Sequence, residues 1–196
     1  YDVAAGRMFE EMVPGRIWMH SSGRPCMGND YGECRWSSEM WADMTFRRMG
    51  YDSIFGDLNG EPYTWLLYSR MPYGHFMPKG DMYSLTGNRR EEYYTNNYPE
   101  GLFLAAQLYD NPYIENEWNR MSQLWDGGGY EKFFMMLFDN PEELEEEGKL
   151  KDNLPLTLKS VYPGTSLVAR TSWQEGYNSD NAMVTLDMHE AYIGNH

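Results

Sequence analysis

The chain has 196 residues, of which 41% are hydrophobic, and a formal net charge of -14 at pH 7. This size and apolar content suffice for roughly one to one and a half hydrophobic cores. The negative charge argues against a nucleic-acid partner, which would need a basic face, and no apolar run approaches the length of a membrane span. The two cysteines, Cys26 and Cys34, form neither a disulfide framework nor a zinc motif.

Aromatic residues make up 16% of the chain, with 16 Tyr and 7 Trp. Carbohydrate-binding clefts are often lined by such rings, but large helical domains also fill their cores with them. For any single aromatic ring we favour packing in the core. The high number of aromatic rings in the whole chain favours a carbohydrate-binding cleft. Much of the acid lies in the run PEELEEEG at residues 141–148, which is typical of a solvated helix start.

The first three quarters of the chain predict helices and loops. A rough helical stripe over residues 1–13 is closed by Pro14-Gly15, and a loop rich in Gly, Ser and Pro follows at residues 16–30. The strongest helix is predicted at residues 31–49, with Gly50 as its stop. Further short helices are predicted at residues 62–69, 98–109, 111–125 and 131–138.

Strand patterns are confined to the end of the chain. A Pro-punctuated linker is expected at residues 154–164, and three short strands follow in the segments SLVARTSW, NAMVTLDM and AYIGNH. We expect strands to begin only near Ser166. Because so small a sheet is not stable alone, we expect the chain to be cut from a longer protein, with Asn195 and His196 at the edge of the missing part.

Two motifs of this strand region resemble a known family. ARTSW at residues 169–173 is followed, about twenty residues later, by a strand ending in GNH. This arrangement resembles the start of the β-sandwich domain in the heparinase II/III-like polysaccharide lyases, where an (α/α) toroid precedes the sandwich. Upstream features, similar in order to the back half of that toroid, are the GNDYGECRW helix start, the RRMGYD helix end, the RMPYGHFMPKGD loop and the DNLPLT linker.

The resemblance covers most of the chain and implies its architecture. It implies a mainly α fold, with the C-terminal part of an (α/α) toroid over residues 1–162 and the first strands of an antiparallel β-sandwich over residues 163–196. A helical pair with a tight Asp-Asn-Pro join suits a toroid or a solenoid, and the absence of a fixed-period repeat disfavours the solenoid. Any structural zinc of the family would lie in the sandwich beyond His196, so no metal site or cofactor is expected within these residues.

The resemblance also implies a periplasmic or secreted enzyme that cleaves an acidic polysaccharide or oligosaccharide by β-elimination. This chemistry needs positive charge or hydrogen bonds to neutralise the uronate carboxylate, a base to remove the C5 proton and an acid to protonate the leaving O4. The family residue that neutralises the carboxylate lies upstream of Tyr1. The isolated chain is therefore expected to be inactive.

Tyr31 is the candidate catalytic base or acid. It opens the strongest predicted helix, and Arg35 lies four residues on, on the same face. An arginine there would lower the pKa of Tyr31, which is ~10 for free tyrosine, or hold the substrate carboxylate. The resemblance carries the family's catalytic tyrosine to Tyr31, although Cys26-Met27 stands where the family shows His-Gln. The alternative is a tyrosine packed in the core.

By resemblance, His196 is the second catalytic residue, opposite Tyr31, with Asn195 beside it in the substrate site. Both reactive groups must reach one sugar ring, so we expect them within about 10 Å of each other. His20 is expected in the loop before Tyr31, either facing the cleft or in solvent. Arg70 and His75 are substrate-binding candidates in the RMPYGHFMPKGD loop.

A polyanion must be held by positive charge, so a local basic patch is expected around Arg35 and the loop at residues 70–79 despite the net charge. Two other functions compete with the lyase. A glycoside hydrolase would need two opposed carboxylates, and the nearest loop acids, Asp30, Glu33 and Asp81, form no evident pair. A non-catalytic glycan-binding protein would keep the aromatics and leave the glycan uncut.

Overall fold

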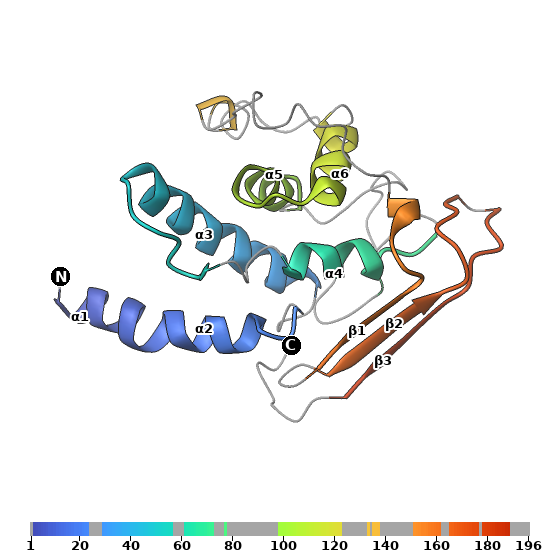
Figure 1. Ribbon diagram of the computed structural model, residues 1–196, viewed down its shortest axis with the longest axis horizontal. Helices are drawn as coiled ribbons and strands as arrows, with labels where there is room; N and C mark the ends of the chain where they lie inside the picture. The colour runs from blue at the N-terminus through green and yellow to red at the C-terminus, as the bar shows by residue number, and fades with distance from the viewer. Residues whose placement is uncertain are drawn as a thin grey trace.

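The computed structural model describes residues 2–23, 29–56, 61–72, 77, 98–122, 133, 135–137, 151–161, 165–176 and 178–188. For residues 29–34, 61–63, 98–99 and 121–122 it describes the backbone alone. Helices form one part of the described molecule, and an antiparallel sheet lies at its side (Figure 1). The helices are α1 (Asp2–Gly6), the π-helix η1 (Arg7–Met12), α2 (Val13–His20), α3 (Asn29–Arg48), α4 (Glu61–Ser69), α5 (Tyr98–Leu108), α6 (Pro112–Ser122) and the 3-10 turn η5 (Lys151–Asn153).

The first three helices form one continuous rod, so the helix end expected at Pro14-Gly15 is wrong. Within the rod the Val13 N–H donates to the Met8 carbonyl, five residues back, as in a π-helix. Pro14 lies in the first turn of α2, where its missing N–H and its ring are tolerated. The helix therefore runs through the Pro-Gly pair and ends at His20.

Helix α3 runs antiparallel to this rod (Figure 1). The rings of Phe9 and Phe46 pack edge to face at 5.6 Å, and those of His20 and Trp36 lie 5.1 Å apart. Residue numbers therefore rise along the rod as they fall along α3. The predicted helix at residues 31–49 is confirmed, and so is its stop: Gly50 has φ +88 and donates its N–H to the Arg47 carbonyl at 2.9 Å.

The main core lies where α3 packs against α5 and α5 against α6. Both helices of the predicted pair are present, and Asn111 caps the second one through its Oδ1, which accepts the N–H groups of Tyr113 and Ile114 at 3.1 and 3.3 Å. The fully buried large side chains of this core include Trp36, Met40, Leu66, Leu102, Phe103, Leu104 and Ile114.

The expected partial (α/α) toroid is wrong. In the described residues, the α1–α2 rod lies beside α3, α5 packs on α3, and α6 packs beside α5, with α4 beside the sheet. These helices form no ring of helical hairpins around an axis (Figure 1). The strands beside them form a three-stranded antiparallel sheet. One tight helical pair, α5–α6, did not determine how the other helices would pack, because ring closure depends on contacts between distant segments.

The sheet has the order β1 (Thr157–Ser160), β2 (Ser166–Arg170) and β3 (Met183–Asp187). The strands predicted in SLVARTSW and NAMVTLDM are confirmed, whereas the AYIGNH segment lies outside the described residues. The expectation that strands begin only near Ser166 is wrong, because β1 lies in the predicted linker and pairs with β2. Pro155 and Pro163 flank this strand and leave its four residues free to pair.

The inner face of the sheet packs on α4 through a second apolar cluster. Tyr68 and Trp173 meet edge to face at 4.9 Å, with Trp65 and Val168 in the same cluster. The Tyr68 hydroxyl donates to the Pro155 carbonyl at 2.6 Å, and burial raises the pKa of Tyr68 to about 12. This contact connects α4 to the segment that leads into β1.

Removing the Tyr68 hydroxyl should weaken this connection. We expect Tyr68→Phe to lower the free energy of unfolding by about 1 kcal/mol, the net value of one hydrogen bond, with the ring packing preserved. Urea unfolding followed by circular dichroism measures the change. Tyr51→Phe, at a tyrosine that is 63% exposed, is the matched control and should leave stability unchanged. Equal stability of the two variants would contradict a structural role for the hydroxyl.

Candidate functional site

A polar cluster lies where α2 crosses the first half of α3. On α2, Arg16 and His20 are one turn apart, and on α3, Arg35 and Glu39 are one turn apart. Because the helices are antiparallel, these two pairs come to the same region. We call this region the α2–α3 seam, and define it by Arg16, His20, Arg35, Trp36 and Glu39.

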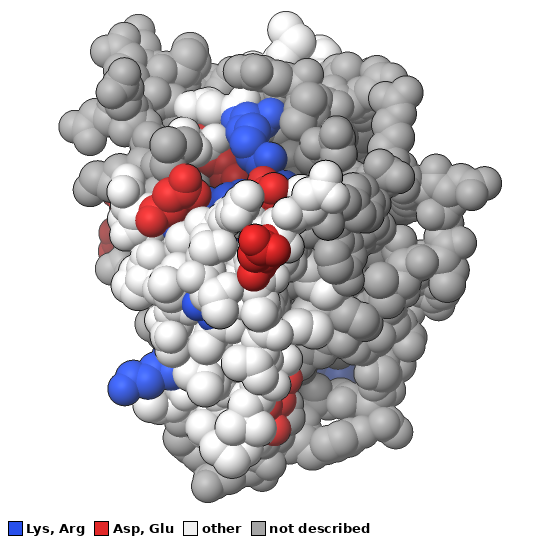
Figure 2. All heavy atoms as spheres, turned by 90° about the vertical axis from the view of Figure 1, so that its right-hand side faces the viewer, with Lys and Arg blue, Asp and Glu red and all other residues white. Residues whose placement is uncertain are grey.

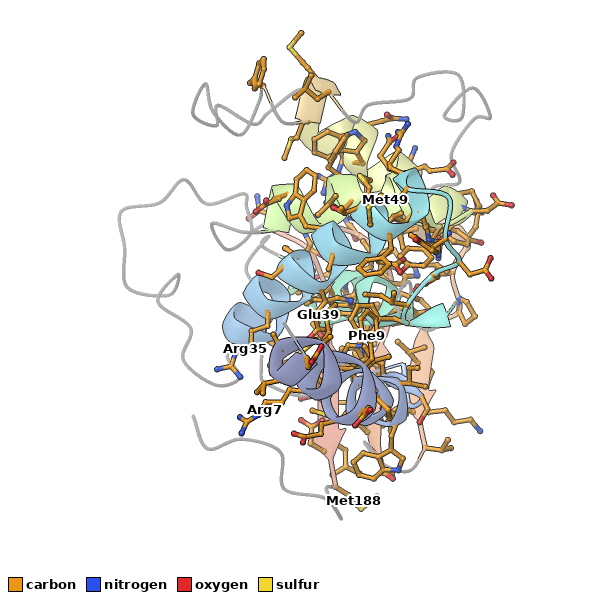
Figure 3. All side chains as sticks on the ribbon, turned by 90° about the vertical axis from the view of Figure 1, so that its left-hand side faces the viewer. Arg7, Phe9, Arg35, Glu39, Met49 and Met188 are labelled. Atoms are coloured by element: carbon orange, nitrogen blue, oxygen red, sulfur yellow. The ribbon has the colours of Figure 1, made fainter. Side chains whose placement is uncertain are left out.

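Glu39 is the buried acid of the seam, with 7% of its surface exposed. Arg16 Nε lies 2.6 Å from Glu39 Oε1, whereas Glu39 Oε2 has no hydrogen-bond partner among the described residues. Figure 3 shows Glu39 between α3 and the N-terminal rod, and Arg35 projecting outward from α3. One carboxylate oxygen is therefore paired and the other is buried without a partner, which is a costly state for an ionised carboxylate.

Burial raises the pKa of Glu39 above its ordinary value, although the charge and hydrogen bond of Arg16 and the charge of Arg35 partly oppose this. The folded state therefore binds a proton at Glu39 more tightly than the unfolded chain does. Stability linked to this group is greatest at and below the ordinary glutamate pKa, and it declines as the pH rises through the raised pKa of the folded state. Glu39 thus carries a proton closer to neutral pH than an exposed glutamate would.

Neutralising this carboxyl should stabilise the fold at neutral pH. We expect Glu39→Gln to raise the melting temperature at pH 7, because glutamine avoids burying a charge that Arg16 only partly compensates. The difference from the unsubstituted chain should vanish as the pH falls to about 4, where Glu39 itself is neutral. Thermal unfolding at several pH values measures this. A variant that is less stable at neutral pH would show that the Arg16 ion pair outweighs burial.

His20 lies inside the seam and not in a loop. It is the last residue of α2, is 4% exposed and packs on the Trp36 ring. His20 was expected in a loop because the preceding helix was expected to end at Pro14-Gly15. Once α2 is extended, the four-residue spacing from Arg16 puts both side chains on one face.

The two residues expected to start the catalytic helix have the predicted spacing. Helix α3 begins at Asn29, so Tyr31 lies in its first turn and Arg35 one turn later. The Arg35 side chain is exposed, and its charge acts on Glu39. The side chain of Tyr31 lies outside the described atoms, as do His75, Asn195 and His196 altogether. The expected approach of Tyr31 to His196 therefore stays a prediction.

Arg70 lies in a buried ion cluster. Its Nη1 donates to Glu117 Oε1 at 2.6 Å, and its Nε lies 3.4 Å from Glu175 Oε1. Arg120 and Lys151 also pair with these acids. Figure 2 shows basic and acidic side chains close together on this face of the molecule. Arg70 is the charged residue in the described part of the RMPYGHFMPKGD loop. Its charge was expected to form a basic surface patch, but it pairs with Glu117 and Glu175 instead.

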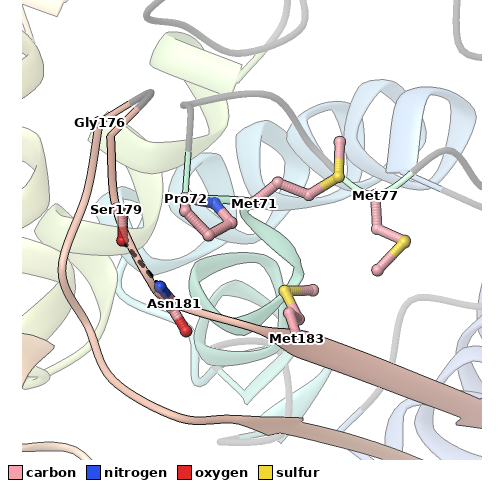
Figure 4. Close-up of a pocket in the computed structure, with 7 residues that line it drawn as sticks. All are labelled: Met71, Pro72, Met77, Gly176, Ser179, Asn181 and Met183. Carbon is pink, nitrogen blue, oxygen red and sulfur yellow. Dashed lines mark hydrogen bonds between the residues drawn. The ribbon is translucent and has the colours of Figure 1, made fainter.

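A hollow of about 250 Å³ lies where that loop meets the segment between β2 and β3 (Figure 4). The two segments are joined by the Gly176 N–H, which donates to the Pro72 carbonyl at 2.7 Å. Thioether and proline carbons form most of the lining, and Ser179 and Asn181 supply polar groups. Such a surface can hold a half-apolar group such as a sugar ring. The lining residues are Met71, Pro72, Met77, Gly176, Ser179, Asn181 and Met183.

No protein-family model matches this chain, and no curated protein matches it. Within the described ranges, no group of three or more His, Cys, Asp or Glu side chains could hold a metal ion. The zinc that the resemblance implies was expected beyond His196, and this expectation stays a prediction. A search of the same ranges finds no helix with the length and apolar character that a membrane span requires.

Proposed function

We propose that this chain is part of a polysaccharide lyase that cleaves uronic-acid glycans by β-elimination, as its resemblance to the heparinase II/III-like lyases implies. The observation that supports this most is the position of Tyr31 and Arg35, one turn apart at the start of α3. The seam adds Arg16 and His20 from α2 on the side of α3 where Glu39 lies. A tyrosine one helical turn from an arginine is a suitable acid–base group for this chemistry.

In the proposed reaction, Arg35 would hold the uronate carboxylate and stabilise the negative charge that develops as the C5 proton leaves. Tyr31 would remove that proton, a role for which a tyrosine needs a cation or hydrogen-bond donors nearby. His196 would protonate O4 as its bond to C4 breaks, and a C4–C5 double bond would form. The substrate is an acidic polysaccharide or oligosaccharide, and the enzyme would act in the periplasm or after secretion.

A non-catalytic glycan-binding protein is the second candidate. The hollow beside β3 favours it, because Ser179 and Asn181 there combine with thioether carbons, a lining that suits a sugar ring without any catalytic group. Arg70 is buried in an ion cluster, so its charge pairs with acids of the fold and not with a substrate carboxylate. This candidate predicts binding without any change in glycan length.

One assay separates the three functions. The native protein is incubated with heparan sulfate, alginate and hyaluronan, and ultraviolet absorbance and chain length are followed. Elimination shortens the glycan and creates a conjugated double bond that absorbs, which is the expected result on one of these substrates. Shortening without absorbance would indicate a hydrolase, and binding without shortening would indicate the glycan-binding protein. Either of the last two results would refute the lyase.

A further inference from the structure

We propose that the α2–α3 seam is a carboxylate-binding site in which an incoming uronate carboxylate replaces Glu39 on Arg16 while Glu39 takes up a proton. This deepens the proposed function, on which the choice of a uronate rests. It assigns Arg16 and Glu39 a role that the resemblance to the lyases does not supply.

The geometry of the Arg16–Glu39 pair permits such an exchange. Arg16 Nε contacts only one of the carboxylate oxygens, Oε1, at 2.6 Å, and within the part of the chain that the structure describes the other oxygen has no hydrogen-bond partner. Arginine–carboxylate pairs are frequently bidentate, which adds both energy and geometric specificity. A single contact is the arrangement that a second carboxylate can displace, because only one charge-assisted hydrogen bond has to be exchanged.

The charges around the seam explain why a proton must enter. In the described residues, Arg16 of α2 and Arg35 of α3 are the charged groups that act on Glu39, and the titratable His20, one turn from Arg16, packs on Trp36. A ligand carboxylate on Arg16 would leave Glu39 buried and ionised without its ion pair, which is strongly unfavourable. Neutral glutamic acid avoids burying an unpaired charge. The proton can bind to Oε2, the oxygen that has no hydrogen-bond partner among the described residues.

The burial of Glu39 already raises its pKa in the free protein, so adding the proton costs less free energy than it would at an exposed glutamate. Arg16 keeps its charge throughout, the ligand stays ionised, and solvent supplies the proton. Arg35, exposed one turn from Glu39, gives the ligand a second positive charge. Thermodynamic linkage then requires carboxylate binding to weaken as the pH rises, because the bound state holds more protons than the free state.

The test is isothermal titration calorimetry of the 196-residue chain with glucuronate, in buffers of different ionisation enthalpy, with glucose as the neutral control. We expect glucuronate, but not glucose, to bind with uptake of up to about one proton, and its affinity to fall with rising pH. Glu39→Gln should bind glucuronate several-fold more tightly, without proton uptake and without pH dependence. Arg16→Gln should weaken binding about tenfold, the value of one charge-assisted hydrogen bond.

Arg7→Gln is the matched control, because Arg7 is exposed on the same rod and lies away from Glu39 (Figure 3). It should bind glucuronate like the unsubstituted chain. Absence of glucuronate binding, or proton uptake that persists in Glu39→Gln, would overturn the proposal. The proposed function is judged separately by the ultraviolet-absorbing product. Lyase activity without proton uptake on glucuronate binding would contradict only the carboxylate exchange. Proton uptake without lyase activity would contradict only the proposed function.

Discussion

Tyr31→Phe in the native protein is expected to lower the rate of β-elimination by a factor of about 100 to 10,000, the usual contribution of a general base. The substitution removes one hydroxyl from the first turn of α3 and keeps the ring. Helix formation and glycan binding should therefore be nearly unchanged. The loss should appear in kcat, because the proton transfer occurs only on the way to the transition state.

The measurement is the initial rate of absorbance increase with the best substrate, together with a binding assay of the same variant. Tyr51→Phe, at an exposed tyrosine beyond the end of α3, provides the control and should turn over normally. A Tyr31→Phe enzyme with near-normal turnover would refute the assignment of Tyr31. A parallel loss of binding and rate would indicate that the ring packs in the core.

Much of the local structure could be predicted from the sequence, because it follows from short-range signals. Helix α3 and its end at Gly50, the two helices α5 and α6, and the strands β2 and β3 were each predicted from a period or a capping residue. Such signals act within a few residues of the chain. They do not depend on which distant segments come together.

The errors concern features that depend on context. Pro14-Gly15 resembles a helix end, but a π-turn before it lets the helix continue. The segment before Ser166 resembles a linker, but its residues 157–160 pair with β2 and form the strand β1. The toroid required a particular packing of helices, and the observed packing of α3, α5 and α6 follows from long-range contacts. In each of these cases tertiary packing prevailed over the local pattern.

The ARTSW motif, which suggested the resemblance, has a structural role here. Arg170 lies 4.1 Å from the centre of the Trp173 ring and donates a hydrogen bond to the Arg70 carbonyl. The Trp173 indole N–H donates to the Leu154 carbonyl at 3.0 Å. The motif thus fastens the sheet to the end of α4. Its residues can be explained by this joint without any catalytic requirement.

The Arg16–Glu39 pair could not be found from the sequence alone. Its two residues are 23 positions apart, and one of them lay in a segment interpreted as a loop. A charge pair between two helices becomes visible only when their antiparallel register is known. The signal that was available is the four-residue spacing of Arg16 and His20, which fits one face of a helix.

Arg70→Met is expected to lower the free energy of unfolding by about 3–5 kcal/mol, the cost of removing one partner from a buried ion pair. Glu117, which is 3% exposed, would lose its 2.6 Å contact with Arg70 and keep its charge in the interior, where the more exposed Arg120 remains a partner. Chemical denaturation of the folded chain measures the loss. Lys159→Met, at an exposed cation on β1, should change stability by less than about 0.5 kcal/mol.

A second variant separates loss of the pair from loss of packing. In Arg70→Met/Glu117→Met neither partner remains as an isolated charge, so most of the lost stability should return. The same series tests the expectation that Arg70 binds substrate. A structural Arg70 predicts an unstable single variant that the second substitution restores. A single variant of normal stability and reduced glycan binding would instead place Arg70 in the substrate site, and would contradict the structural role inferred from its burial.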